Sequence, residues 1–214
     1  MSARSWMGRL DPRQMLSIPA VYKFHSGFVS PDRHKQSYVD EILKVQSGSR
    51  LLDIGCGTAD IVRYLPDVDY VGFDGDAEYI ESARETFGDR GRFEHRIISA
   101  DVARDFPPFD QAIATGILHH LTDDETRDLF SAAVQALKPG GRLVTCDGTY
   151  TTPQNPAARF LISLDRGQHV RTPDAYEALA RSVFGSVDVE IRTDLIRIPY
   201  THCVMTCTRS ASEA

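Results

Sequence analysis

The chain has 214 residues, 42% of them hydrophobic, and a formal net charge of −6 at pH 7. This length suits one α/β domain with a sizeable core, and the acidic balance argues against nucleic acid as a partner, because nonspecific binding of nucleic acid depends mainly on clustered Lys and Arg. The sequence has no run of about 18 apolar residues, and its first ten residues lack a secretion-signal pattern. We therefore expect a cytoplasmic protein with no membrane partner.

Strand and helix patterns alternate from residue 35 onward, which is typical of a parallel sheet with helices on both faces. Ser30-Pro31 is expected to start the first helix. Further helices are predicted from Asp76 to Phe87, from a capping box at Thr122 to Leu137, and from Thr172-Pro173 to Gly185. The last two strands, Val187 to Arg192 and Arg197 to Thr208, should form an antiparallel pair at one edge.

The most informative stretch is LLDIGCGTAD, residues 51–60, in which an apolar strand runs into a Gly-x-Gly turn. Asp53 closes the strand, while Gly55 and Gly57 permit positive φ and a close approach to a ligand; a helix is expected to follow. A second apolar strand ends in Asp74, where a carboxylate would accept hydrogen bonds from a ribose diol. The two signals together predict a site for a nucleotide-type cofactor.

The residue three positions after Gly57 decides which cofactor is expected. A dinucleotide site has a third glycine there, whereas this chain has Asp60. A carboxylate would repel a pyrophosphate at the start of a helix. The predicted ligand therefore has a ribose and an adenine but no phosphates.

These residues resemble motif I and the acidic strand end of the class I S-adenosylmethionine-dependent methyltransferases, in particular the small type-11 and type-12 group. Ser99-Ala-Asp101-Val102 is similar to the family's adenine contact, Phe109 to Gly116 to its fourth strand, and Leu137 to Gly141 to the turn before its fifth strand. The resemblance covers roughly residues 35–209. It implies a single-domain α/β, Rossmann-like fold: a seven-stranded, mostly parallel sheet with an antiparallel edge strand and helices on both faces.

The resemblance also implies S-adenosylmethionine as cofactor, S-adenosylhomocysteine as product, and no need for a metal. The residues expected to contact the cofactor are Tyr22, Asp53, Gly55, Cys56, Gly57, Asp74, Gly75, Asp101, Val102, Thr115 and Gly116. Tyr22 lies in residues 1–34, which we expect to form a helical lid. There its hydroxyl would reach the methionine carboxylate while Phe24 excludes water, although ordinary packing on a helix face is an alternative.

Residues just after each strand are the candidates for chemistry, because ligands of open α/β sheets bind beyond the carboxyl ends of the strands. His119 and His120 follow the fourth strand, and an imidazole can take a proton from an attacking hydroxyl or amine near neutral pH. One of them could equally cap a helix or hold the cofactor loop. Either histidine is thus a candidate base, in a reaction that placement alone can largely drive.

The stretch after the fifth strand, residues 149–171, lies outside the common core and should border the substrate. Candidate substrate contacts in and beside it are Asp147, Tyr150, Arg166, His169 and Arg171. Guanidinium groups bind carboxylate or phosphate well, but arginines in such a stretch are also commonly solvated or paired with nearby Asp residues.

The four cysteines, Cys56, Cys146, Cys203 and Cys207, have no CxxC spacing, and we expect no disulfides among them. Cys203 and Cys207 with His202 could suggest a metal site, but on a strand the two thiols would lie about 13 Å apart along one face, so core thiols are expected.

The place where relatives that methylate nucleobases or glutamine carry Asn-Pro-Pro-Tyr reads Thr-Gly-Ile-Leu-His-His here, which favours an alcohol acceptor. We expect O-methylation of a sugar or secondary-metabolite intermediate by a monomer or homodimer. Alternatives are N- or C-methylation of a small metabolite, and a non-catalytic cofactor-binding regulatory protein. A nicotinamide oxidoreductase would need a Tyr-x-x-x-Lys pair, which the sequence lacks.

Overall fold

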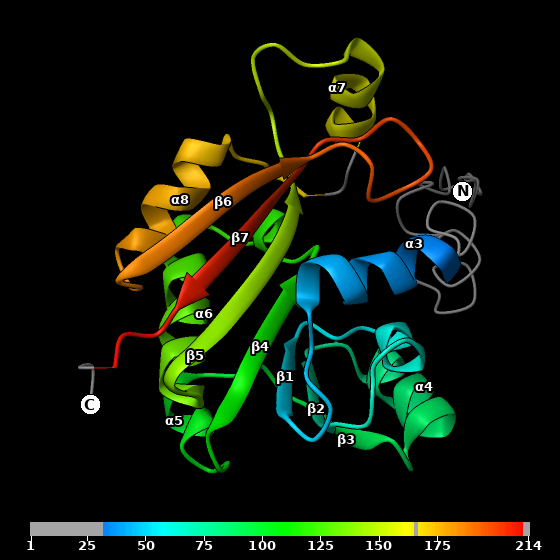
Figure 1. Cartoon of the computed structure of the whole chain (residues 1–214), viewed down its shortest axis with the longest axis vertical. Helices are drawn as coiled ribbons and strands as arrows, with labels where there is room; N and C mark the ends of the chain where they lie inside the picture. Colours follow the sequence, from blue (N-terminus) through cyan, green and yellow to red (C-terminus); the bar gives the residue numbers. More distant parts are fainter. Residues whose placement is uncertain (1–31, 165–166, 212–214) are drawn as a thin grey trace, which may run out of the picture.

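The computed structural model describes residues 32–164 and 167–211 and contains one seven-stranded sheet with the order β3-β2-β1-β4-β5-β7-β6 (Figure 1). The strands are β1 (Arg50–Ile54), β2 (Asp69–Asp74), β3 (Gly91–His95), β4 (Phe109–Thr115), β5 (Leu137–Gly148), β6 (Ser186–Arg192) and β7 (His202–Thr208). β7 runs antiparallel to both β5 and β6, whereas the pairs among β1 to β5 are parallel. The predicted Rossmann-like methyltransferase fold is confirmed.

The helical elements are α3 (Asp32–Ser37), the π-helix η1 (Tyr38–Leu43), the 3₁₀ turn η2 (Asp60–Arg63), α4 (Ala77–Phe87), α5 (Ala100–Ala103), the 3₁₀ turn η3 (Leu118–His120), α6 (Asp123–Ala136), α7 (Pro156–Ser163) and α8 (Pro173–Arg181). Asp76, Thr122 and Thr172 cap α4, α6 and α8, with a complete capping box at Thr122. These three start signals read from the sequence are therefore correct, while Ser30-Pro31 lies outside the described residues. None of the helices within the described ranges could serve as a membrane span.

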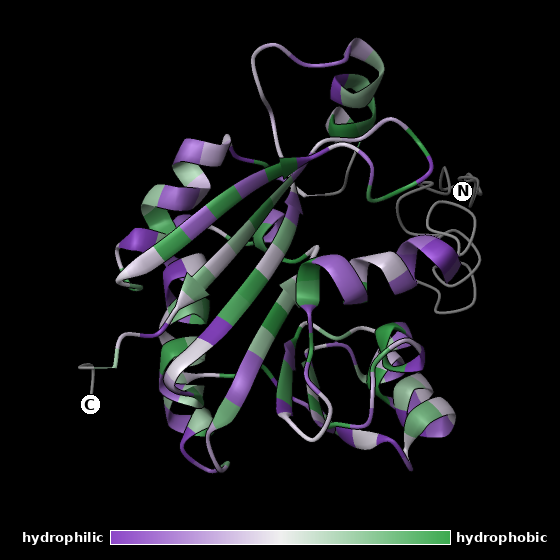
Figure 2. Cartoon of the chain, in the orientation of Figure 1, coloured by the Kyte–Doolittle hydropathy of each residue, from purple (hydrophilic) through white to green (hydrophobic). Residues whose placement is uncertain are grey.

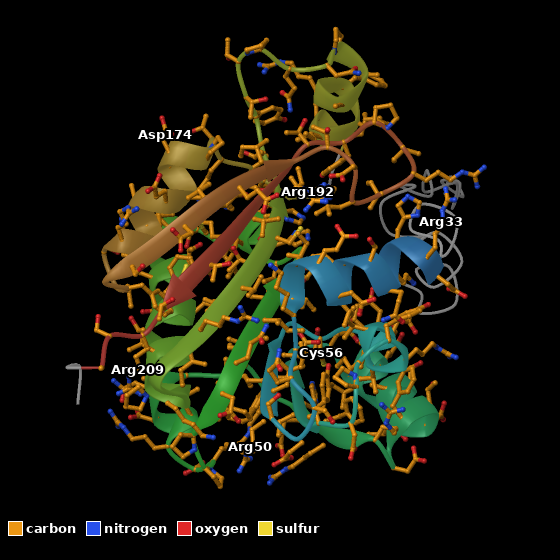
Figure 3. The ribbon with its side chains drawn as sticks, viewed as in Figure 1. Arg33, Arg50, Cys56, Asp174, Arg192 and Arg209 are labelled. Carbon is orange, nitrogen blue, oxygen red and sulfur yellow. The ribbon has the colours of Figure 1, made fainter. Side chains whose placement is uncertain are left out.

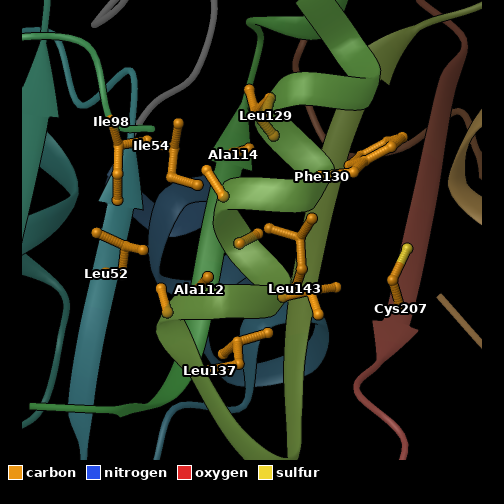
Figure 4. Packing of buried hydrophobic residues seen from close by; sticks show 14 of the residues in the cluster. Leu52, Ile54, Ile98, Ala112, Ala114, Leu129, Phe130, Leu137, Leu143 and Cys207 are labelled. Atoms are coloured by element: carbon orange, nitrogen blue, oxygen red, sulfur yellow. The ribbon is translucent and has the colours of Figure 1, made fainter. Parts of the chain in front are cut away.

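Each face of the sheet packs against its own set of helices. Successive strand residues point to opposite faces, so Leu52 packs on the side of α5, α6 and α8 while Leu51 packs on the side of η1, η2 and α4. Figure 4 shows the first core, where Phe130 of α6 is fully buried, and Figure 2 shows that the helices alternate apolar and polar residues. Both faces are covered, as a largely parallel sheet requires.

Three predicted boundaries are wrong. The helix expected to run from Thr172-Pro173 to Gly185 ends at Arg181. The helix expected after the Gly-x-Gly turn is only the single 3₁₀ turn η2, because Ala59 before it has a left-handed backbone with φ 54°. The last strand begins at His202 rather than Arg197, because residues 193–201 bend away from β6 before the chain re-enters the sheet. This bent segment covers part of the site described below.

Candidate functional site

The turn after β1 uses its backbone N–H groups inside the protein. Gly55 N and Cys56 N donate to Phe73 O at 2.8 and 3.0 Å, and Gly57 N donates to Asp74 Oδ2 at 2.8 Å. Gly55 and Gly57 have φ of 76° and 53°, which glycine adopts without strain. These three amides are therefore not aimed at a bound anion, and the turn fits a ligand that lacks phosphates.

Asp74 is fixed at the end of β2 with both oxygens bonded to the chain. Its Oδ1 accepts from Asp76 N at 2.8 Å, and its Oδ2 accepts from Gly57 N. Each carboxylate oxygen has a second lone pair, so Asp74 can still accept hydrogen bonds from a diol. The two backbone bonds hold it in position for that contact.

A central cavity of about 260 Å³ lies at the carboxyl end of the sheet, between the Gly55 turn, η1 and the 193–201 segment. The residues of this central cavity that matter below are Tyr38, Asp53, Gly55, Thr115, Cys146 and His202. In Figure 3, Cys56 of the turn is labelled below the helix that Figure 1 labels α3. The cavity therefore lies where ligands of open α/β sheets bind.

Asp53 is a buried carboxylate in this cavity. It is 5% exposed, and the Tyr70 hydroxyl donates to its Oδ2 at 2.6 Å. Burial raises the pKa of Asp53 to about 7, and the nearby Asp74 adds to the rise. Burial makes the charged form of this carboxylate unfavourable in free energy, and a cation bound beside it would offset that penalty.

Tyr38 was not among the site residues predicted from the sequence. It opens the π-helix, in which Lys44 N donates to Val39 O at 2.7 Å, and its hydroxyl lies 2.9 Å from Thr115 Oγ1. Burial raises the pKa of Tyr38 well above its ordinary range, so the hydroxyl stays protonated. π-Helical turns are frequent at functional sites, but no sequence periodicity indicated this one.

A second cavity of about 400 Å³ lies on the other side of Gly55, and we call it the Ile97 cavity. Its walls include Asp74, Gly75, Ile97, Ile117, His120 and Asp128. Gly55 borders both cavities, and the Ile117 side chain packs against it so closely that a Cβ at residue 55 would collide. Glu125, Asp128 and Arg96 also line this cavity, and its apolar side chains beside the fixed Asp74 carboxylate suit a flat ring joined to a ribose.

Comparison with known proteins agrees with this geometry. A model of the methyltransferase domain family matches residues 52–143, from β1 into β5. Phosphoethanolamine N-methyltransferase 3 of Arabidopsis thaliana is 30% identical over 181 residues, 80% of this chain and 36% of that protein. This chain belongs to the class I S-adenosylmethionine-dependent methyltransferases.

Further proteins are similar to this chain in sequence or in fold. O-methyltransferase cnsE of Penicillium expansum is 27% identical to this chain, over 72% of the chain and 58% of that protein. In structure, phosphoethanolamine N-methyltransferase 2 of Haemonchus contortus matches with a TM-score of 0.70 at 17% identity, over 92% of this chain and 58% of that one. A TehB-like methyltransferase of Corynebacterium glutamicum matches with a TM-score of 0.65 at 18% identity, over 94% and 100%. The chain thus spans about a third to two thirds of the curated relatives it matches.

The two histidines of the methyltransferase lie in different surroundings. His119 is 6% exposed, its Nδ1 lies 2.8 Å from Asp147 Oδ1, and its backbone N donates to the same oxygen at 3.2 Å. Gly167 packs directly on the His119 ring, where a Cβ would collide. His120 is exposed and borders the Ile97 cavity. The His119–Asp147 hydrogen bonds therefore fix the loop after β4. Of the two histidines, only His120 borders a cavity.

Arg171 also bonds within the protein. Its guanidinium donates to Leu118 O at 2.9 Å, to Leu121 O at 2.7 Å and to Asp123 Oδ1 at 2.8 Å. The side chain is 8% exposed, so its charge is engaged by the loop between β4 and α6. Arg171 was predicted to bind substrate, but its bonds hold the insertion (residues 149–171) against this loop.

The other predicted contacts lie outside the two cavities. Asp101 is 89% exposed and pairs with Arg104 at 2.6 Å, and its neighbour Val102 packs partly against the core. Tyr150 lies under the Arg159 guanidinium, 5.1 Å from its ring centre, and His169 N donates to His119 O at 3.0 Å. Gly116 N donates to Cys146 O at 2.8 Å, which fixes the turn after β4. Tyr22 and Arg166 lie outside the described residues.

The four thiols are free, and Cys146, Cys203 and Cys207 are buried, as the sequence predicted. Burial raises the pKa of Cys203 and of Cys207 to about 12, so both remain neutral thiols. In residues 32–164 and 167–211, no three His, Cys, Asp or Glu side chains are grouped as metal ligands.

Proposed function

We propose that this protein binds S-adenosylmethionine across the central cavity and the Ile97 cavity, and that it transfers the methyl group to a hydroxyl group of a small molecule. The observation that carries the proposal is the pair of cavities that share Gly55, with Asp53 in one and Asp74 in the other. Asp53 and Asp74 thus lie on opposite sides of the Gly55 turn. This arrangement suits a ligand that has an ammonium at one end, near Asp53, and a ribose further along, near Asp74.

The residues on the two sides fit the two ends of the cofactor. Asp74 would accept from the ribose hydroxyls, and Ile97 with Ile117 would pack on the adenine. Asp53 would face the methionine ammonium, which would favour its charged form. Asp60 also borders the central cavity, and its negative charge suits a cationic ligand better than a phosphate. Tyr22 remains a predicted lid residue, and Asp101 and Val102 remain predicted adenine contacts.

The bound cofactor supplies an electrophilic methyl group on a positively charged sulfur. Held by Asp53 and Asp74, it would donate this methyl group to the acceptor oxygen and leave as S-adenosylhomocysteine. The hydroxyl proton leaves for solvent or a nearby base. Because His119 is buried and bonded to Asp147, we infer that it positions the loop, and that holding the acceptor in line supplies most of the rate.

Besides the charged Lys35, Asp53 and Asp60, the central cavity offers the acceptor three uncharged groups, which favour a hydroxyl. Tyr38, Thr115 and His202 border the central cavity; burial keeps Tyr38 protonated and lowers the pKa of His202 to about 4. All three side chains are thus uncharged near neutral pH. Such groups can accept from or donate to an uncharged hydroxyl without leaving a buried charge unpaired. We propose a sugar or secondary-metabolite intermediate as the acceptor.

A second candidate is N-methylation of a small amine. It is favoured by the 30% identity to a phosphoethanolamine N-methyltransferase. An amine acceptor has to lose its proton before attack. His120 is the base predicted from the sequence, whereas the cavity that it borders is the one assigned above to the adenine. A non-catalytic cofactor-binding protein remains the alternative of another class.

Two measurements test the proposal. Calorimetry should show binding of S-adenosylmethionine and S-adenosylhomocysteine and none of NAD. An S-adenosylhomocysteine-release assay over hydroxyl, amine, protein and RNA acceptors should give turnover with small hydroxyl compounds; activity confined to protein or RNA would overturn the proposal. Replacing each of His119 and His120 by Gln distinguishes placement from base catalysis. Unchanged turnover of H120Q from pH 6 to 9 would exclude His120 as a base.

A further inference from the structure

A third cavity lies between the start of the insertion and the bent segment before β7. It has a volume of about 360 Å³, and we call it the Tyr200 cavity. Its polar walls come from Thr151, Gln154, Asn155, Thr193, Tyr200 and Thr201. Figure 1 shows α7, which begins within this wall, next to the 193–201 segment at the end of the sheet where the central cavity also lies.

The Tyr200 cavity adjoins the central cavity at two rings that contact each other at a tilt of 43°. Tyr200 borders the former and His202 borders the latter, and their ring centres lie 4.8 Å apart. Gly148, at the end of β5, lies beneath Tyr200 and opposite His202 in the sheet. A Cβ at residue 148 would meet the Tyr200 hydroxyl, so a glycine at this position allows Tyr200 to lie against His202. A molecule that extends beyond the central cavity past these rings would enter the Tyr200 cavity.

The walls of the Tyr200 cavity carry hydrogen-bonding groups without charge. Gln154 Nε2 donates to Thr149 O at 2.9 Å, and Gln154 Oε1 accepts from Thr151 N at 3.5 Å. Asn155 caps α7 with its oxygen. Within the described part of the chain, the Asn155 amide nitrogen and the hydroxyls of Thr193 and Thr201 make no hydrogen bond to protein. These are donors and acceptors for a ligand.

The chemistry of these walls selects one class of group. A phosphate or carboxylate would need Arg or Lys, and neither is among the described residues that line the cavity. Amides, hydroxyls and one aromatic ring match a group that has many hydroxyls and no charge, because each hydroxyl both donates and accepts. A sugar ring fits this description, with one apolar face available to pack on Tyr200.

We propose that the Tyr200 cavity is a second acceptor subsite, which binds an uncharged, hydroxyl-rich group such as a glycosyl unit while the reacting hydroxyl of the same molecule lies in the central cavity. This inference rests on the proposed function. It distinguishes the acceptor of this protein from a phosphate ester, the acceptor class that the names of its phosphoethanolamine N-methyltransferase relatives suggest.

Three matched probes test the subsite: hydroquinone, its mono-β-D-glucoside and its monophosphate. Their dissociation constants are measured by calorimetry with the full chain saturated with S-adenosylhomocysteine. We expect the glucoside to bind at least about 10-fold more tightly than hydroquinone, the equivalent of one or two good hydrogen bonds, and the phosphate to gain nothing. Equal binding of glucoside and hydroquinone, tightest binding of the phosphate, or no binding of the glucoside would overturn the proposal.

Variants at Thr193 link the preference to this cavity. Thr193→Val should reduce the glucoside preference about 5-fold, and Thr193→Arg should reverse the order so that the phosphate binds more tightly than the glucoside. Thr206→Val on β7 is the matched control and should behave as wild type. A Thr193→Val protein with wild-type preference would contradict the assignment.

The cofactor measurement separates the two hypotheses. If S-adenosylhomocysteine itself does not bind, the proposed function fails. If it binds to wild type and all three variants alike but the glucoside has no advantage, only the subsite fails.

Discussion

Replacement of Asp53 by Asn is expected to stabilise the fold while weakening cofactor binding. Burial raises the Asp53 pKa from 3.8 to about 7. Because the folded state then holds a proton that the unfolded state has lost, stability falls as pH rises from about 4 to about 7 and is flat above. One pKa unit is worth about 1.4 kcal/mol, so the charged form costs about 4 kcal/mol at pH 8.

Asparagine removes this charge but keeps an oxygen that can accept from Tyr70. Its NH₂ group would lack a partner, which costs about 1–3 kcal/mol, so D53N should be about 1–3 kcal/mol more stable than wild type at pH 8. S-adenosylmethionine should bind at least about 10-fold more weakly, because a hydrogen bond to a charged group is lost.

The assay is urea unfolding of wild type and D53N at pH 5, 6, 7 and 8, with calorimetry at pH 8. Asp69→Asn is the control, because this carboxylate is 58% exposed in its pair with Arg50 and should change neither quantity. The reasoning would be refuted if D53N were less stable than wild type at pH 8 and if its free energy of unfolding changed with pH as that of wild type does.

Three further variants test separate parts of the site. Gly55→Ala should abolish measurable cofactor binding and cost about 1–3 kcal/mol of stability, because φ is positive and the new Cβ meets Ile117; wild-type binding by calorimetry would contradict this. His119→Ala should cost about 3–5 kcal/mol in urea unfolding, since Asp147 is left buried without its partner, and an unchanged midpoint would show that the pair does not hold the loop. Arg192→Met should loosen the bent segment and speed its cleavage by protease several-fold, with little loss of global stability, because Arg192 pairs with Asp194 at 2.8 Å; equal cleavage rates would argue against this tie.

The features that the sequence predicted well are local ones. Gly55 and Asp74 stand beside apolar strand segments, and both lie at the strand ends where the pattern placed them. Thr122 and Thr172 begin helices because a capping residue and its first turn are adjacent in sequence. The helix α7 carries the same signal at Asn155-Pro156, which would have predicted it within the insertion.

The features that the sequence did not predict depend on distant contacts. Tyr38 reaches Thr115 across 77 positions through a π-turn, and His202 enters the central cavity because residues 193–201 bend before β7. His119 and His120 are neighbours in a 3₁₀ turn, and only tertiary packing decides that the first is buried while the second faces a cavity. Sequence pattern identifies a strand end but not the direction of each side chain there.

The bridge between Thr149 and Arg171 joins the two ends of the insertion. Thr149 Oγ1 donates to Arg171 O at 2.8 Å, and Arg171 is itself anchored to the loop after β4. Because both ends are fixed next to each other, the length of the segment between them can change with little change in the entropy of closing this loop. Grafting the corresponding stretch of a relative between these two positions is therefore a practical route to altered acceptor range, with the cofactor site left intact.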